Sequence, residues 1–549
     1  MLILALPAPL VTAQVRLPAL GDGLPDELSV GSERRYGDQV MREIRRDPAY
    51  LDDPVLLAYV QSIWQPLVDA ARRRGDISPD ADALLAWEAF LVQDRSVNAF
   101  ALPGGFVGIH LGMIAVTDSR DELASVLAHE LSHVTQRHIA RSVAAASQQS
   151  ALGIAAMILG MIAASRSGNA DMAQAALAGG QAVMLQGQLN FSRDMEREAD
   201  RVGYGVFSDA GHTPAGMATM FEKLDHASRL NDSGGFPYLR SHPLTVDRLA
   251  EARSRVGLAG SAASPAAVAS NATPTAPAAN LASNAANDTA AQGSHELMRA
   301  RAMVLMEPTV LAWRRHVDQA GAPLAGAGRV GRLYAGVLAA ALLREHAVSE
   351  TLWAALRAAT VAVAGTAGTG AGGAAELRWL RAETLLARGD ADAAARTLES
   401  APLASAGATG SVRPELLLRA QTALRRFETG SGPRAELRAV TEQLQSWVAV
   451  QKFDAAAWGL LGQCHAASGA RLRSLRAQAE ARVSLGDIPS AIDRLRAAQS
   501  EARRGENIDF VEASVIDARL RDLEGQRRRL AAEMRERGGG RSSGEPEPR

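Results

Sequence analysis

The chain has 549 residues, of which 47% are hydrophobic and 22% charged, and its 59 lysines and arginines nearly balance its 60 aspartates and glutamates. This length exceeds what one hydrophobic core organises, and the balanced charge excludes a strongly basic chain built to bind nucleic acid. The single cysteine, Cys464, excludes an intramolecular disulfide, so packing and any bound metal must stabilise the fold.

The first 13 residues, MLILALPAPLVTA, are apolar and end in small residues, as a secretory signal does before its cleavage site. They lack the positively charged start of such a signal. A truncated signal at residues 1–13 is the favoured interpretation and predicts an exported protein. An apolar terminus without a targeting role is the alternative.

Residues 98–105, NAFALPGG, predict a strand that runs into a Pro-Gly-Gly turn. If this strand lies at the edge of a small sheet, it can bind an extended polypeptide as an additional strand. The residues that would do so are Asn98, Ala99, Phe100 and Ala101. An ordinary sheet edge without this role is the alternative.

A helix is expected to begin after Ser119, because Ser119 and Glu122 form a capping box before an apolar run, and to continue to about residue 140. It carries the pattern His-Glu-x-x-His. His129 and His133 lie on one face and can converge on one metal ion, with Glu130 beside them. Surface histidines are the alternative, although this pattern is rare by chance.

A second acidic segment, residues 190–207, places Glu196 and Asp200 four residues apart. Alone, it would be a solvated face or would compensate a helix dipole. Paired with the two histidines, it predicts Glu196 as a third metal ligand and Asp200 as the carboxylate that orients a liganding imidazole. Glu198 should face elsewhere. Three protein ligands leave a fourth position for water, as in catalytic zinc sites.

This arrangement predicts hydrolysis of peptide bonds with one zinc ion per chain. Zinc would acidify a water molecule and polarise the carbonyl, while Glu130 takes the water proton and passes it to the leaving amine. His242 and Arg248 are candidates to stabilise the oxyanion. The other histidines of this half are expected to be structural or exposed, and His138 should lie on the opposite helix face from His129; they are His110, His138, His212 and His226.

The remaining segments define the organisation of the chain. Residues 151–164 are apolar but shorter than the roughly 20 residues that cross a bilayer, so buried packing is favoured over membrane or partner contact. Residues 257–294, rich in Ala, Ser, Pro and Asn, predict a flexible linker after a domain at 27–256. Residues 295–535 predict helical hairpins of the tetratricopeptide type, with generic hairpins as the alternative, and 536–549 a disordered tail.

Four segments, in this order, resemble the zinc metallopeptidases related to the CAAX prenyl protease and the HtpX heat-shock protease: NAFALPGGFVGIHLGMI, ASVLAHELSHVTQRH, SRDMEREADRVG and SHPLTVDRLAEAR. The helical repeats after a soluble catalytic domain make the chain similar to the periplasmic β-barrel assembly-enhancing proteases. The resemblance implies a mainly α gluzincin-type domain with a small β-sheet, followed by an α-helical tetratricopeptide-like solenoid.

The same resemblance implies roles for single residues. His129, His133 and Glu196 would be the zinc ligands, Glu130 the catalytic base, and Asp200 the residue that supports a ligand. His242 would belong to a loop over the active site, where its imidazole can take the fourth zinc position in a resting enzyme. The alternative is that His242 only caps the helix that starts near Leu244.

By resemblance, we expect a periplasmic endopeptidase that degrades misfolded or stalled outer-membrane β-barrel proteins, while its repeats bind the β-barrel assembly machinery. Peripheral contact with a membrane is compatible with this expectation, and nucleic acid is not an expected partner. The alternative is a chaperone or assembly adaptor that acts through the repeats and keeps a latent zinc site. A structural zinc site is a third, weaker alternative.

Overall fold

The computed structural model describes residues 29–145, 193–230, 236–262, 277–322, 328–367, 373–399, 409–504 and 509–539. The expected signal at 1–13 and the apolar segment 151–164 lie outside these ranges, as do residues 540–549 of the expected tail. Residues 536–539 belong to the end of the last helix. None of the helices in the described ranges combines the length and apolarity that a bilayer span requires.

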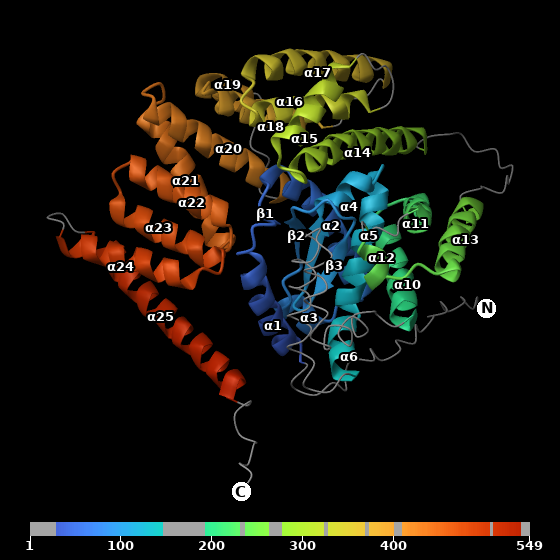
Figure 1. Ribbon diagram of the computed structural model, residues 1–549, viewed down its shortest axis with the longest axis horizontal. Coiled ribbons are helices and arrows are strands. Elements are labelled where there is room, and N and C mark those ends of the chain that lie inside the picture. The colour runs from blue at the N-terminus through green and yellow to red at the C-terminus, as the bar shows by residue number, and fades with distance from the viewer. Residues whose placement is uncertain are drawn as a thin grey trace, which may run out of the picture.

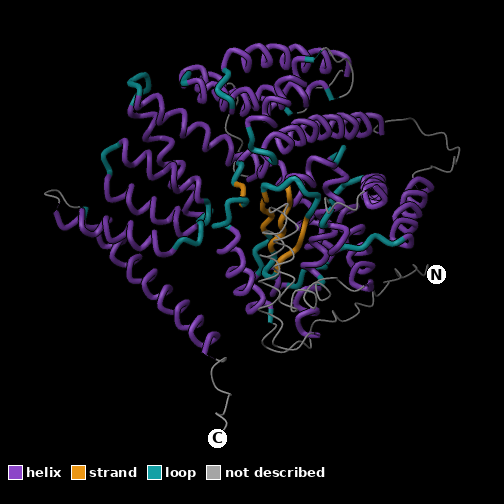
Figure 2. The backbone as a smooth tube through the Cα atoms, viewed as in Figure 1, coloured by secondary structure: helices purple, strands orange, loops and turns teal. Residues whose placement is uncertain are grey.

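The N-terminal domain contains a four-stranded sheet with the order β1-β2-β4-β3 (Figure 2). Its strands are β1 (Tyr50–Leu51), β2 (Glu88–Val92), β3 (Ala99–Leu102) and β4 (Phe106–His110). Strands β2 and β4 are parallel, and β3 and β1 pair antiparallel to β4 and β2. The predicted strand at 98–105 is therefore confirmed as an edge strand. Its turn depends on Gly104 and Gly105, which both have positive φ angles (85° and 86°).

The N-terminal domain also contains ten described helices (Figure 1). They are α1 (Val30–Ile44), α2 (Pro54–Arg74), α3 (Pro79–Leu84), α4 (Leu111–Val116), α5 (Arg120–Thr135), α6 (His138–Ala145), α10 (Arg193–Asp209), α11 (Pro214–Leu230), α12 (Tyr238–Ser241) and α13 (Val246–Ala262). Helix α5 is central, and every residue from Glu122 to Val134 is buried. Helices α2, α10 and α11 and strand β3 pack against it. The residues of the His-Glu-x-x-His pattern are thus held inside the domain.

Helix α5 begins where the capping box predicts but ends earlier than expected. The Ser119 side chain accepts a hydrogen bond from the Glu122 amide, and the helix starts at Arg120. The expected continuation to residue 140 is wrong, because α5 stops at Thr135 and α6 starts at His138. Arg137, with a φ angle of 52°, makes the break. No glycine or proline marks this position in the sequence.

The C-terminal helical domain contains twelve described helices. They are α14 (Pro277–Leu305), α15 (Val310–Gly321), α16 (Arg329–Leu342), α17 (His346–Ala367), α18 (Ala374–Arg388), α19 (Ala391–Glu399), α20 (Thr409–Glu428), α21 (Arg434–Val450), α22 (Ala455–Ala467), α23 (Arg471–Ser484), α24 (Ile488–Arg504) and α25 (Phe510–Gly539). Consecutive helices pack as hairpins and curve around one side of the N-terminal domain (Figure 1). The mainly helical fold with a small sheet and a solenoid-like second half agrees with the sequence prediction.

Two described helices extend into the segment 257–294 that was predicted to be a flexible linker. Helix α13 extends to Ala262 and α14 starts at Pro277, so only residues 263–276 of that segment lie outside the described helices. Alanine has the highest helix propensity, and an alanine-rich segment can form a helix when one end of it packs on a domain. That end is the His295 region, whose imidazole contacts the Tyr59 hydroxyl (2.5 Å) and the Thr117 carbonyl (3.1 Å) of the N-terminal domain.

The two domains share a buried junction. Arg301 of α14 is 4% exposed and forms ion pairs with Asp53, at the start of α2, and with Glu383 of α18. Tyr59 of the N-terminal domain and Leu297 of α14 belong to one continuous hydrophobic cluster. The helical domain is therefore packed firmly against the N-terminal domain rather than tethered to it.

Candidate metal centre

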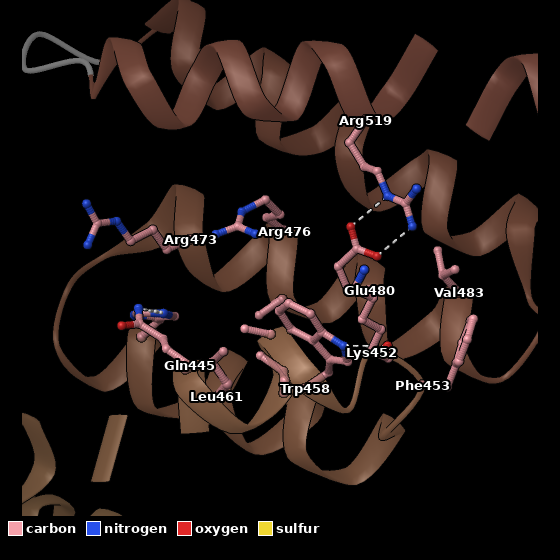
Figure 3. Close-up of a pocket in the computed structure, with 14 residues that line it drawn as sticks. Gln445, Lys452, Phe453, Trp458, Leu461, Arg473, Arg476, Glu480, Val483 and Arg519 are labelled. Atoms are coloured by element: carbon pink, nitrogen blue, oxygen red, sulfur yellow. Dashed lines mark hydrogen bonds and ion pairs between the residues drawn. The ribbon is translucent and has the colours of Figure 1, made fainter. Parts of the chain in front are cut away.

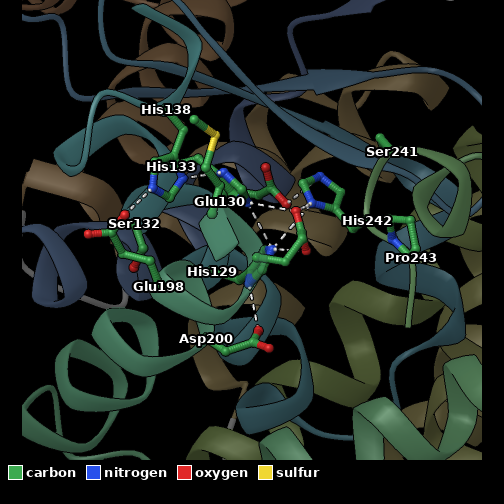
Figure 4. Close-up of polar contacts among 12 residues, drawn as sticks. His129, Glu130, Ser132, His133, His138, Glu198, Asp200, Ser241, His242 and Pro243 are labelled. Atoms are coloured by element: carbon green, nitrogen blue, oxygen red, sulfur yellow. Dashed lines mark hydrogen bonds and ion pairs between the residues drawn. The ribbon is translucent and has the colours of Figure 1, made fainter. Parts of the chain in front are cut away.

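Four buried side chains from three parts of the N-terminal domain converge at one point (Figure 4). Helix α5 contributes His129 and His133, α10 contributes Glu196, and the residue after α12 is His242. One donor atom of each lies within 4.8 Å of the other three, and none of the four residues is more than 2% exposed. The structure thus brings together the three predicted ligands and adds a fourth donor.

The distances between these donor atoms match the requirements of zinc. His129 Nε2 lies 3.0 Å from His133 Nε2 and 3.3 Å from His242 Nδ1, and His242 Nδ1 lies 2.9 Å from Glu196 Oε1. His133 Nε2 lies 3.5 Å from Glu196 Oε1. A tetrahedral zinc ion with ligands at about 2.05 Å has edges of about 3.3 Å between its ligands. The four side chains therefore fit a zinc ion in both donor chemistry and spacing.

The ligand count predicted an open fourth position, whereas the family resemblance placed His242 there. His242 Nδ1 lies where a fourth ligand would lie, and His242 Nε2 lies 3.4 Å from Glu130 Oε1. The ring of Tyr238 packs against the His242 ring at a centroid distance of 4.7 Å. His242 is the C-cap residue of α12 and does not cap the following helix, which begins at Val246.

Glu130 is fully buried beside the four donor atoms. Neither of its carboxylate oxygens accepts a hydrogen bond from the part of the chain that the structure describes. A buried carboxylate without hydrogen bonds lowers stability, so Glu130 is better explained by a role in the chemistry of the site. A carboxylate in this position can accept a proton from a water molecule at the centre.

Asp200 supports the ligand His129 from behind. Its Oδ1 lies 3.0 Å from His129 Nδ1, which leaves Nε2 directed to the centre. Arg248 donates two hydrogen bonds to Asp200 (2.6 and 2.9 Å) and one to the Pro243 carbonyl, and it pairs with Glu196 at 2.8 Å. The predicted oxyanion role of Arg248 is therefore corrected, because its buried N–H groups are committed to carboxylates and to the His242 loop.

The electrostatics of this cluster favour ligation. Burial opposes ionisation of Glu196, but the nearby His242 and His129 outweigh it and hold the Glu196 pKa far below its ordinary value. Burial also opposes a charge on His129, but hydrogen bonds to Asp200 and Glu196 raise its pKa to about 10. Glu196 is thus ready to ligate, whereas a metal at His129 must displace a proton.

His138 and Glu198 lie outside the four donor residues, as expected, but the expected position of His138 on the opposite helix face is wrong. The break after α5 instead places His138 Nδ1 2.9 Å from His133 Nδ1, and His138 Nε2 lies 3.0 Å from Glu198 Oε2 (Figure 4). Burial lowers the His138 pKa to about 4, which keeps it neutral near pH 7. The sequence carries no signal for this contact, since the helix break is unmarked.

The edge strand β3 packs against α5, the helix that carries the histidines. The His110 amide donates to the Asn98 carbonyl (3.0 Å), so Asn98, Phe100 and Leu102 direct their backbone groups toward β4. By alternation, the N–H and C=O groups of Ala99 and Ala101 point away from the sheet. Both residues are buried, with Ala99 at 0% and Ala101 at 8% exposed.

Comparisons with known proteins agree with the geometry. Residues 57–256 match the model of peptidase family M48. The chain is 36% identical over 239 residues to the β-barrel assembly-enhancing protease of Escherichia coli K12, covering 44% of this chain and 47% of the relative. The Yersinia pestis protein of the same name is 35% identical over 249 residues, covering 45% and 48%. The mitochondrial metalloendopeptidase OMA1 of Saccharomyces cerevisiae is 30% identical over 199 residues, covering 35% and 53%. The chain thus spans about half the length of these relatives.

Proposed function

We propose that this chain, in which residues 57–256 form a peptidase family M48 domain, is a zinc-dependent endopeptidase. One observation carries the proposal. Four buried donor atoms lie within 4.8 Å of one another, and among the described residues neither oxygen of the Glu130 carboxylate beside them accepts a hydrogen bond. His129, His133 and Glu196 would hold the ion.

Each residue of the site has its own role in hydrolysis. Zinc, when bound, acidifies a water molecule and polarises the scissile carbonyl. Glu130 accepts the proton of the attacking water and delivers it to the leaving amine. Asp200 holds His129 in the tautomer that directs Nε2 to the centre, and Arg248 holds Asp200 and Glu196 in place. Burial of the whole set excludes bulk water and strengthens these interactions.

The substrate enters as an extended chain along β3. The outward-pointing backbone groups of Ala99 and Ala101 would pair with a substrate strand. Strand β3 packs against α5, so a chain paired at this edge would lie beside the helix that carries Glu130. Backbone pairing selects for extended conformation more than for side chains, which suits unfolded polypeptides.

His242 regulates access in this proposal. Its Nδ1 lies where a fourth ligand would lie, and its Nε2 lies 3.4 Å from Glu130 Oε1. The His242 ring therefore fills the space beside Glu130 that the attacking water must occupy. The resting enzyme is therefore blocked by its own histidine, and the α12 segment must move before a substrate is cleaved. His242→Ala is expected to raise the resting rate of peptide cleavage. An unchanged rate together with unchanged zinc affinity would remove His242 from this role.

The names of two relatives support a proposal for the substrate class, the partner and the location. Both are named β-barrel assembly-enhancing proteases. We therefore assign misfolded or stalled outer-membrane β-barrel proteins as substrates, the β-barrel assembly machinery as the partner of the helical domain, and the periplasm as the location.

A second candidate function is that of an assembly adaptor, and a cavity in the helical domain favours it. A cavity of about 570 Å³ lies among α21, α22, α23 and α25. Trp458 and Phe453 line it together with Lys452, and Arg519 closes one side through a bidentate ion pair with Glu480 (Figure 3). A chaperone or adaptor would use this surface to hold a partner while the zinc site stays latent.

The decisive experiment compares digestion of a denatured outer-membrane β-barrel protein by wild type and by Glu130→Gln, after zinc content has been measured for both. The substitution keeps every proposed ligand, and loss of a general base costs about 10²-fold or more in rate. Glu222→Gln, at a half-exposed glutamate of α11, is the matched control. Equal digestion by wild type and Glu130→Gln would refute the mechanism. No digestion by wild type with zinc bound would favour the adaptor.

A further inference from the structure

The Nδ1 nitrogens of the two ligand histidines of α5, His129 and His133, contact different partners. A zinc ligand that binds through Nε2 carries its proton on Nδ1 and needs an acceptor for it. His129 finds this acceptor in the Asp200 carboxylate, 3.0 Å from its Nδ1. The His133 Nδ1 lies 2.9 Å from the Nδ1 of His138 instead.

The protonation states along this contact are determined by its far end. His138 Nε2 lies 3.0 Å from Glu198 Oε2, and a carboxylate only accepts, so the His138 proton is on Nε2. The His138 Nδ1 then has a free lone pair and accepts the proton of His133 Nδ1. The His133 Nε2 lone pair is left for the metal. We propose that His138 and Glu198 form a hydrogen-bond relay that holds His133 in its zinc-ligating tautomer.

The backbone is strained at the one point that makes this relay. A continuous α5 would place His138 about 140° around the helix from His133, out of contact. Arg137 breaks the helix with a φ angle of 52°, a conformation that costs a non-glycine residue about 1 kcal/mol or more. Its side chain donates to Glu33 of α1 at 3.0 Å, and this pair lies mostly out of solvent.

The far end of the relay is also held in place. Arg141, one turn along α6 from Arg137, donates to Glu198 Oε2 at 2.8 Å. Glu198 thus receives one hydrogen bond from His138 and one from Arg141, and the latter lowers the Glu198 pKa against the effect of its partial burial. His138 itself is fully buried, so water does not substitute for either partner. His138 and Glu198 are positioning residues, since neither donates an atom to the zinc cluster.

The test measures zinc affinity and needs no substrate. His138→Phe keeps the ring volume and removes the acceptor, whereas His138→Asn places an amide oxygen close to the former Nδ1 position. Zinc dissociation constants would be measured for the full-length chain by competition with a chromophoric chelator. Loss of such a support typically weakens metal binding by 10- to 100-fold. We expect this loss for His138→Phe and recovery to within a few-fold of wild type for His138→Asn.

His295→Phe is the matched control. His295 is equally buried and hydrogen-bonded on both ring nitrogens, but its partners are Tyr59 and Thr117. This variant should unfold more easily than wild type and bind zinc with wild-type affinity. It separates the loss of a buried histidine from the loss of the relay.

Each outcome has a definite meaning. Wild-type affinity in His138→Phe, or an equal loss in His138→Phe and His138→Asn, would overturn the relay and leave the proposed peptidase function intact. Because the inference rests on the zinc site of the proposed function, failure of the wild-type chain to bind zinc would overturn both. In Co²⁺-substituted protein, the absorption spectrum of His138→Phe should differ from wild type more than that of His138→Asn, since a rotated His133 changes the ligand field of the ion.

Discussion

Replacement of Arg301 by methionine should loosen the packing of the helical domain on the N-terminal domain. Arg301 donates four hydrogen bonds of 2.7–2.8 Å to Asp53 and Glu383. The side chain of Asp53 is only 10% exposed and that of Glu383 24%. Methionine fills much of the space but leaves two carboxylates facing each other with little water. Removing one member of a buried ion-pair network costs about 3–5 kcal/mol.

Hydrogen exchange followed by mass spectrometry is the suitable assay, because unfolding of a chain with two domains is not a single two-state step. Peptides from the C-terminal half of α14 should exchange about 100-fold faster or more in Arg301→Met. Arg438→Met is the control, because Arg438 is 81% exposed in a surface pair with Glu442 and should change protection by less than about 1 kcal/mol.

A triple variant tests whether unpaired buried charge causes the instability. Arg301→Met with Asp53→Asn and Glu383→Gln removes the unpaired charges, while asparagine preserves the N-cap of α2. If unpaired buried charge causes the instability, most of the lost protection should return. Protection as low in the triple variant as in Arg301→Met would refute this account, and wild-type protection in Arg301→Met would show that the junction does not depend on the ion pair.

Three further predictions concern other parts of the chain. Burial raises the pKa of the Cys464 thiol to about 11, so at pH 8 only about one molecule in a thousand carries the thiolate. Iodoacetamide should therefore label Cys464 only after the protein unfolds. Burial lowers the His295 pKa to about 4, whereas the unfolded histidine binds a proton near pH 6.5. Protection of α14 from hydrogen exchange should therefore fall by about 3 kcal/mol between pH 6.5 and 4, and by less in His295→Gln. Ala101→Pro removes an outward N–H of the edge strand and should lower kcat/KM for a denatured protein about tenfold at unchanged zinc affinity; an unchanged kcat/KM would exclude strand pairing at this edge.

Local sequence patterns determined the helices that carry the chemistry. The capping box at Ser119 sets the start of α5, and the spacing of His129 and His133 directs both imidazoles to one side of it. The four-residue spacing of Glu196 and Asp200 does the same on α10. These predictions succeed because they depend on helical periodicity, which acts between residues one turn apart.

The tertiary structure decided which groups face one another across elements. Arg248 of α13 is committed to Asp200 and Glu196 of α10 because α13 packs on α11, and no spacing along the chain encodes that contact. Helix α14 begins within the segment 257–294 that was predicted to be a linker, and its contacts with Tyr59 and Thr117 are made by His295, just beyond that segment. His138 reaches His133 only because Arg137 takes a left-handed conformation. Such a conformation persists only where surrounding contacts outweigh its cost, and these contacts exist only in the folded chain.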